Sequence, residues 1–213
     1  MWSLIVKGGW VMWPILACGA VAVALFVERA FHLHRAQIKT EDFLSGIFTN
    51  ATRGNLAEAV SICDQTPGPV ACIVRDALLH ADEPAELLEQ ALRKVGLGEI
   101  PRLEKNLGGL MTIAQIAPML GLLGTVVGLI RVYAMMEGQA PLAEIGDLSG
   151  GIWQALITTA AGICVAVPAY AAHRFLLGRV DAITLDMEFA KEEIFHFLTY
   201  ERGRNEAVDH DAE

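Results

Sequence analysis

Charged residues are missing from three long stretches of this sequence. No Asp, Glu, Lys or Arg occurs in residues 10–27, 106–130 or 152–172. Each stretch has about the length of a helix that crosses a bilayer, roughly 20 residues. A mean hydropathy of +0.42 reflects the same three stretches and is too high for an ordinary soluble domain. The sequence therefore predicts an all-α membrane protein with three transmembrane helices.

The residue patterns of metal sites and catalytic centres are also missing. The four cysteines show no metal or disulfide spacing: Cys18, Cys63, Cys72 and Cys164. His32, His34 and His80 have no companions at the spacing of metal ligands. There is no glycine-rich phosphate loop and no Ser/His/Asp or paired-carboxylate pattern. We expect a protein that is not an enzyme, with no metal or cofactor and with reduced cysteines.

Basic residues are scarce, and their placement is uneven. The formal net charge is -9, which argues against a nucleic-acid partner. Most of the basic residues that flank the uncharged stretches fall on one side: Arg29, Arg35, Lys39, Arg93, Lys94, Arg102, Lys105, Arg174 and Arg179. The segment between the second and third stretches holds only Arg131, against three carboxylates. Because basic residues favour the cytoplasmic side, we expect the N-terminus outside and the C-terminus inside.

The first uncharged stretch lacks the features of a cleaved signal peptide. Its apolar run exceeds the usual 7–15 residues, its basic region is a single lysine, and no small-x-small site follows. Residues 15–18 faintly resemble a lipoprotein cleavage site, but the apolar run continues to Val27. We expect a retained first helix, with Trp2, Trp10 and Trp13 at its outer interface.

Small residues line one face of the second uncharged stretch. At every third or fourth position the side chains shrink from Leu to Ala to Gly: Leu103, Leu107, Leu110, Ala114, Ala117, Gly121, Gly124 and Gly128. A face of this kind lets a second helix approach closely. Pro118 shapes the helix and frees the carbonyl of Ala114. Thr125 stands beside the glycines and carries the only hydroxyl of the second half of the stretch.

The third uncharged stretch repeats this design. Its small face holds Ala155, Thr159, Gly162, Ala166 and Ala169. Pro168 shapes this helix and frees the carbonyl of Cys164.

The two helices are expected to run antiparallel, so two hydroxyls arrive at a similar depth. Thr159 would lie ~10 Å and Thr125 ~8 Å from the outer ends of their helices, at 1.5 Å per residue. The two hydroxyls either face each other or a shared lumen. Alternatively, Thr158 and Thr159 bond back to carbonyls of their own helix.

The segment between the first two spans shows soluble, helical patterning. Thr40 and Asn55 are predicted N-caps, the latter in a capping box with Glu58. Residues 66–69, Thr-Pro-Gly-Pro, predict a turn, and Pro84 is expected in the first turn of the next helix.

An apolar seam continues past the third span at a 3-4 spacing: Leu176, Val180, Ile183, Met187, Ala190, Ile194 and Phe197. We interpret the seam, together with the two small-residue faces, as more contact surface than one chain can bury, and so expect a homo-oligomer.

These patterns divide the chain into eight segments. They are an interfacial N-terminus (1–9), a first span (10–31), a cytoplasmic helical segment (32–106), a second span (107–131), a periplasmic loop (132–150), a third span (151–173), a cytoplasmic helical extension (174–200) and a disordered acidic tail (201–213).

Two stretches resemble one known family. Ala117-Pro118 followed by GLLGTV and Gly128 resembles the second transmembrane helix of the MotA/TolQ/ExbB proton channel family, and residues 152–170 resemble the third. The 213-residue layout is similar to the ExbB/TolQ branch. The resemblance implies a pentamer in the bacterial inner membrane that surrounds the helices of a partner. It also implies conversion of ion-motive force into mechanical work on a periplasmic or outer-membrane process.

The resemblance also implies roles for single residues. Thr125 and Thr159 match threonines that line the ion path, and Gln154 falls at its outer entrance, where the ExbB branch often has Glu. Since the three uncharged stretches hold no carboxylate, the resemblance implies that a titrating group comes from an ExbD/TolR-like single-span partner with a membrane Asp. The rival interpretation is a structural membrane scaffold that conducts no ions. Import, envelope maintenance and motility remain open as the process served, as do H⁺ and Na⁺ as the ion.

Overall fold

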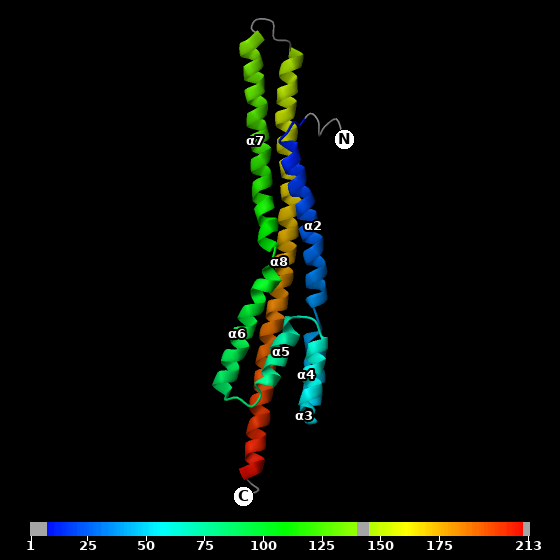
Figure 1. Cartoon of the computed structure of the whole chain (residues 1–213), viewed down its shortest axis with the longest axis vertical. Helices are drawn as coiled ribbons and strands as arrows, with labels where there is room; N and C mark the ends of the chain where they lie inside the picture. The colour runs from blue at the N-terminus through cyan, green and yellow to red at the C-terminus, as the bar shows by residue number, and fades with distance from the viewer. Residues whose placement is uncertain (1–7, 140–144, 211–213) are drawn as a thin grey trace. The chain divides into compact units, whose positions relative to one another are not determined.

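The computed structural model describes residues 8–139 and 145–210, and the side chains of 8–137 and 149–200. Regular structure in these ranges is entirely α-helical (Figure 1). The helices are α2 (Met12–Ala36), α3 (Thr40–Thr52), α4 (Leu56–Gln65), α5 (Pro69–Leu79), α6 (Ala85–Glu104), α7 (Leu107–Gln139) and α8 (Ile145–His210). Three helical stretches are long and apolar enough to cross a membrane, and they include α2, most of α7 and the greater part of α8. The predicted all-α fold with three spans is confirmed.

The chain divides into two compact units. Unit 1 consists of Met1–Arg29 and Asn106–Leu176, and unit 2 of Ala30–Lys105 and Leu177–Glu213. Unit 1 thus holds all three uncharged stretches. The predicted interfacial residue Trp2 lies outside the described residues, whereas Trp10 and Trp13 are both exposed. Their interfacial position stays a prediction.

Unit 1 is a bundle of α2, α7 and the first part of α8 (Figure 1). The α7 and α8 helices run antiparallel, since Gly128 faces Gly151 while Gly121 faces Thr158. The α2 helix runs parallel to α8, and the rings of Phe26 and Phe175 lie 6.5 Å apart.

Backbone features at the ends and in the middle of α7 explain its course. The helix follows directly on Asn106, which adopts a left-handed φ of 64°. Asn tolerates this conformation better than most residues, so the chain breaks there between α6 and α7. Pro118 and Pro168 lie inside α7 and α8 without ending either helix. Prolines are tolerated in spanning helices because neighbouring groups satisfy the freed carbonyls.

Unit 2 packs around α5, whose residues are mostly buried. The apolar seam of α8 is buried in the same way: Val180, Ile183, Met187, Ala190 and Ile194 are 0–3% exposed within this single chain. Phe197 stacks on Phe48 of α3, with ring centroids 4.5 Å apart.

This burial corrects our interpretation of the seam. The helices of residues 32–105 supply the apolar partners that we assigned to a second copy of the chain. The seam therefore gives no support for an oligomer, and the pentamer stays a proposal.

The predicted helix starts differ in detail from those observed. Thr40 is the first residue of α3 rather than its cap, and Asn55 precedes α4 without a side-chain cap bond. The Asn55 amide instead donates to the Glu58 carboxylate at 3.4 Å. Pro84 occupies the N-cap position of α6, one residue before the helix begins.

Two long helices extend beyond the boundaries that we expected. The α7 helix continues to Gln139 and α8 begins at Ile145, so most of the predicted periplasmic loop is helical. The α8 helix also reaches His210, ten residues into the predicted disordered tail. Residues 132–139 contain Ala, two Met and Glu, which are strong helix formers, and no Pro. The membrane and compartment assignments of all eight segments stay predictions.

Candidate functional site

The backbones of α7 and α8 approach each other closely at glycine positions. A Cβ atom on Gly162 would lie 2.5 Å from the carbonyl oxygen of Ala117, and one on Gly121 would lie 3.0 Å from that of Thr158. At Gly128 it would meet the Gly151 carbonyl at 2.7 Å. The obstacle is backbone in each case, so no side chain fits and the two helices touch main chain to main chain. The glycine face therefore lies against α8 of the same chain rather than open space.

Two further small residues complete this contact. Ala155 and Ala166 are buried, at 3% and 7% exposure, and Ala155 lies against Gly128. The structure thus places the sequence-predicted packing residues of the third span in the core of unit 1.

Thr125 and Thr159 meet across this contact. Their hydroxyl oxygens are 2.5 Å apart, and either can be the donor. Each hydroxyl also lies 3.2–3.4 Å from the carbonyl oxygens of Gly121 and Ala155. The two half-buried hydroxyls and two carbonyls form a four-oxygen cluster with contributions from both helices.

This cluster has a definite chemical capacity. Each hydroxyl brings one proton and two acceptor lone pairs. When one hydroxyl donates to the other, the second is free to donate to a carbonyl. The donor and acceptor roles of the two hydroxyls can also be exchanged. The pair can therefore position a cation or pass on a proton, but it has no group that titrates near neutral pH.

Both alternatives that we left open for the α8 hydroxyls occur. Thr158 is fully buried, and its hydroxyl donates only within its own helix, at 2.9 Å to Gln154 and 3.0 Å to Ala155. Thr159 makes such a bond and the cross-helix bond as well. The Thr158 side chain also packs directly on Gly124, so this residue is part of the helix contact.

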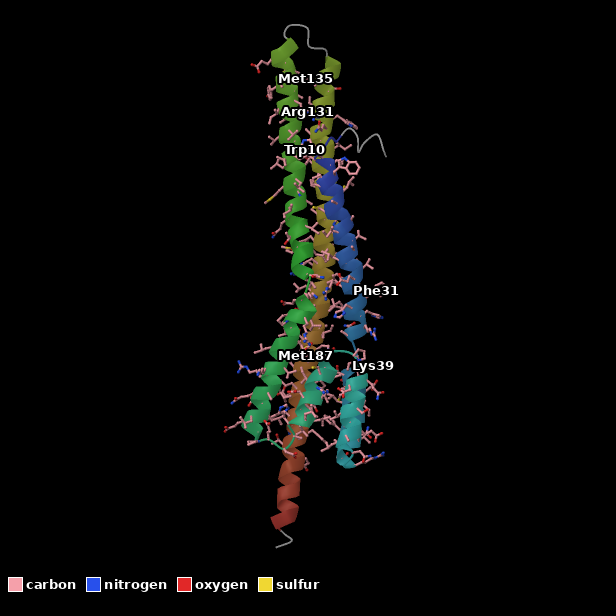
Figure 2. All side chains as sticks on the ribbon, in the orientation of Figure 1. Trp10, Phe31, Lys39, Arg131, Met135 and Met187 are labelled. Carbon is pink, nitrogen blue, oxygen red and sulfur yellow. The ribbon has the colours of Figure 1, made fainter. Side chains whose placement is uncertain are left out.

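Gln154 lies one turn before this cluster in α8 and is only 3% exposed. Its amide oxygen accepts a hydrogen bond from the Arg131 guanidinium of α7, at 2.8 Å. Its amide nitrogen lies against Gly9 and has no hydrogen-bond partner among the described residues. Arg131 and Trp10 lie near the same end of unit 1 (Figure 2). The sequence analysis did not predict the contact of Arg131 with Gln154. The one feature that could have indicated it is that Arg131 is the single basic residue between the second and third uncharged stretches.

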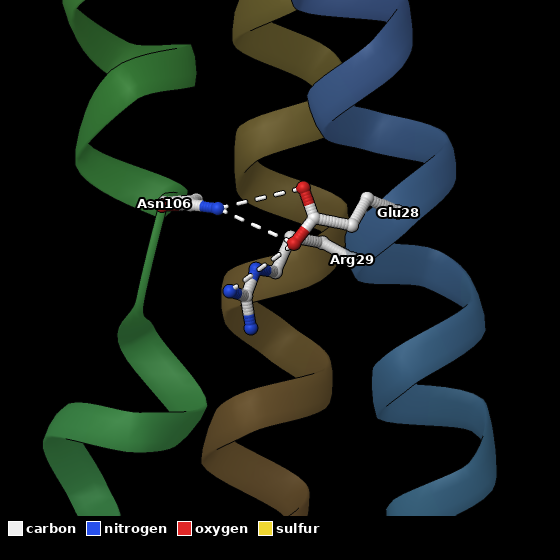
Figure 3. Close-up of polar contacts among 3 residues, drawn as sticks. All are labelled: Glu28, Arg29 and Asn106. Carbon is white, nitrogen blue, oxygen red and sulfur yellow. Dashed lines mark hydrogen bonds and ion pairs between the residues drawn. The ribbon is translucent and has the colours of Figure 1, made fainter.

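A second polar cluster lies at the opposite end of unit 1 (Figure 3). The Asn106 amide donates to the Glu28 carboxylate, at 3.4 and 3.5 Å, and Arg29 pairs with the same carboxylate at 3.5 Å. Arg29 is buried at 3% exposure, and its Nε has no partner among the described residues. The pairing offsets the cost of burying the guanidinium and ties α2 to the start of α7.

Within the described ranges, no group of three His, Cys, Asp or Glu side chains is arranged to hold a metal ion. The thiol of Cys63, in unit 2, is buried, and this burial raises its pKa to about 11, so the thiol is neutral at physiological pH.

Comparison with known proteins agrees with this architecture. A sequence model of the MotA/TolQ/ExbB proton channel family matches residues 66–189, more than half of the chain. The chain belongs to the MotA/TolQ/ExbB proton channel family. Members of this family are channel-type transport proteins, not enzymes, and the similar proteins below belong to its ExbB/TolQ branch.

Three relatives illustrate the range of similarity. A biopolymer transport protein ExbB-like 3 of Synechocystis is 33% identical over 75% of this chain and 77% of its own. An ExbB homolog of Methanothermobacter thermautotrophicus is 29% identical over 82% of this chain, but the match spans only 62% of that relative's length. The Tol-Pal system protein TolQ of Haemophilus influenzae is 35% identical over about half of each chain, 51% and 48%.

Proposed function

We propose that this chain is the channel-forming subunit of a motor of the inner membrane that is driven by ion-motive force. The observation that carries the proposal is the contact of Thr125 with Thr159 between two stretches without Asp, Glu, Lys or Arg, residues 106–130 and 152–172. Two hydroxyls bonded across a helix contact form a polar point in an apolar bundle. At this position the two hydroxyls can supply oxygen ligands to an ion that crosses the membrane.

The proposal requires a partner, because this chain has no Asp, Glu, Lys or Arg in its three uncharged stretches. Proton relays in membranes ordinarily use ionisable side chains. An ExbD/TolR-like partner with a single span and a membrane Asp would bring the carboxylate to the threonine pair. Five copies of this chain would surround the partner's helices, with Gln154 and Arg131 at the outer entrance. The names of the relatives favour biopolymer transport or the Tol-Pal system as the process served.

The orientation in the membrane is part of the proposal. With the N-terminus in the periplasm, a cysteine at Gly138 would face outside and one at Asp64 would face the cytoplasm. After removal of the native cysteines, an impermeant thiol reagent applied to intact cells should label only the first. Labelling of both from outside would overturn the assignment.

Removal of both hydroxyls tests the proposed function. Val keeps the branched shape of Thr, and a side-chain hydrogen bond in a membrane contributes only ~0.6 kcal/mol on average. We expect Thr125→Val, Thr159→Val protein to assemble but to conduct almost no ions when reconstituted with its partner. Ion flux into vesicles under an imposed potential is the measurement. The double Thr→Ser protein, which keeps both hydroxyls, should conduct.

Thr112→Val is the matched control. The Thr112 hydroxyl also lies on α7, but among the described residues it bonds only to the Gly108 carbonyl of the same helix, at 2.8 Å. Thr158→Val serves less well, because the Thr158 hydroxyl packs on Gly124 and a methyl group would crowd that glycine. If the double Val protein conducts at the wild-type rate, the hydroxyls are packing groups and the non-conducting scaffold becomes the better interpretation.

A further inference from the structure

An apolar groove of about 980 Å³ runs along unit 1 between α2 and α8. The lining side chains of α2 fall between Leu16 and Phe26, and those of α8 between Cys164 and Phe175. No charged residue lines the groove, and all of its lining residues belong to unit 1.

The groove exists because α2 and α8 touch at two places and carry mostly small side chains between them. Gly19 lies against Val165 near one end, where a Cβ atom would come within 3.3 Å of the valine. The rings of Phe26 and Phe175 meet at the other end. Alanines supply most of the lining between these contacts: Ala20, Ala22, Ala169, Ala171 and Ala172.

The position of the groove along the spans limits what can fill it. Its lining extends to Phe26 and Phe175, so the groove reaches the ends of the first and third uncharged stretches that basic residues follow. Arg174 lies three residues after Ala171, a groove residue, and so projects from the same side of α8. Arg29 is already paired with Glu28, whereas Arg174 is exposed and forms no ion pair among the described side chains. One unpaired cation therefore stands beside the inner end of the groove.

We propose that the groove seats an acyl chain of an anionic phospholipid, and that Arg174 binds the phosphate of its headgroup. Within a bilayer the medium around this hollow is lipid, and an acyl chain matches its uncharged lining. A phospholipid also carries an anion at the depth where the spans end. The cytoplasmic leaflet is enriched in anionic lipids, which basic residues at the membrane surface attract. The site requires only the membrane location of unit 1 and does not depend on ion conduction; its leaflet rests on the proposed orientation.

Native mass spectrometry of the full chain in detergent tests this site. The protein is titrated with phosphatidylglycerol and, separately, with phosphatidylcholine of the same acyl chains. We expect one tightly held phospholipid per chain and at least tenfold tighter binding of phosphatidylglycerol. Equal binding of the two lipids would overturn the role of Arg174, and no retained lipid would overturn the site.

Two pairs of variants separate the parts of the site. Ala171→Phe fills the groove and should lower lipid affinity at least tenfold, whereas Ala160→Phe, at an exposed α8 position outside the groove, should not. Arg174→Gln should remove the preference for phosphatidylglycerol, and Arg174→Lys should keep most of it. If Ala171→Phe leaves lipid binding intact but dissociates oligomers in the same spectra, the groove holds a second copy of the chain and the proposal is wrong.

Discussion

The helices within unit 1 pack through one kind of contact, and the helices within unit 2 pack through another. In unit 1, α7 meets α8 through Gly121, Gly128 and Gly162, at distances that exclude even a methyl group. In unit 2, α5 and α8 bury large aliphatic side chains, of which Ile73 and Ile183 are each 1% exposed.

The difference follows from the solvent of each unit. Burial of an aliphatic side chain away from water stabilises a fold by ~1.5–3 kcal/mol. Inside a bilayer this drive is absent, because lipid is as apolar as leucine, and helices associate through close packing and hydrogen bonds. Close packing in unit 1 also has a chemical consequence: it brings the hydroxyls of Thr125 and Thr159 within 2.5 Å.

The largest expected effect comes from a side chain placed in the glycine contact. Gly162→Leu should prevent the α7–α8 packing and cost more than about 3 kcal/mol, because the obstacle is the Ala117 carbonyl rather than a movable side chain. Thermal unfolding and size-exclusion chromatography in detergent measure the loss. Gly178→Leu is the control, since a Cβ atom there meets nothing within 4 Å. Equal behaviour of the two variants would disprove the close contact.

Unit 2 should respond to the opposite change. Ile183→Ala deletes buried volume and should lower the free energy of unfolding by ~2–5 kcal/mol. Leu185→Ala, two residues away on α8 at 70% exposure, should change it by less than ~0.5 kcal/mol. Chemical denaturation followed by circular dichroism provides the comparison. A neutral Ile183→Ala would show that the α8 seam is not buried by its own chain.

The polar pair at the end of unit 1 is expected to contribute less. Arg131→Met leaves the amide oxygen of Gln154 without its donor and should cost ~1–3 kcal/mol in stability. Adding Gln154→Leu should recover most of this loss, because no polar group is then left buried and unpaired. The thermal midpoints of the single and double variants in detergent test the coupling. Strictly additive losses would mean that the two side chains do not interact.

The last expected effect appears only at high pH and concerns the thiol of Cys63. Burial raises its pKa from 9.0 to about 11, so the folded protein holds this proton more tightly than the unfolded chain. The resulting contribution to stability is complete below pH 9 and is lost as the pH rises toward 11. Cys63→Ala should therefore show a shallower loss of stability between pH 9 and 11 than wild type. If the free energy of unfolding, measured against pH, falls in parallel for wild type and Cys63→Ala, the raised pKa of Cys63 is contradicted.

The sequence predicted the features that depend on periodicity. The small-residue stripes located the α7–α8 contact, and the matched depths of Thr125 and Thr159 anticipated their meeting. Periodicity identifies an apolar helix face but not the segment that packs against it. The α8 seam from Val180 to Ile194 therefore suggested a second chain, although α helices of residues 32–105 cover it. The hydrogen bond from Arg131 to Gln154 was equally hidden, because it depends on how far α7 continues past its apolar stretch.

A double-mutant cycle of ion flux tests the central claim most directly. The claim is that Thr125 and Thr159 act as one unit, because their hydroxyls share one hydrogen bond. Flux into vesicles would be compared for wild type, Thr125→Val, Thr159→Val and the double variant, each with its partner. Residues that act as a unit lose function together, so each single change should lower flux about as far as the double change. Single effects that multiply in the double variant, or single variants that conduct like wild type, would contradict the account.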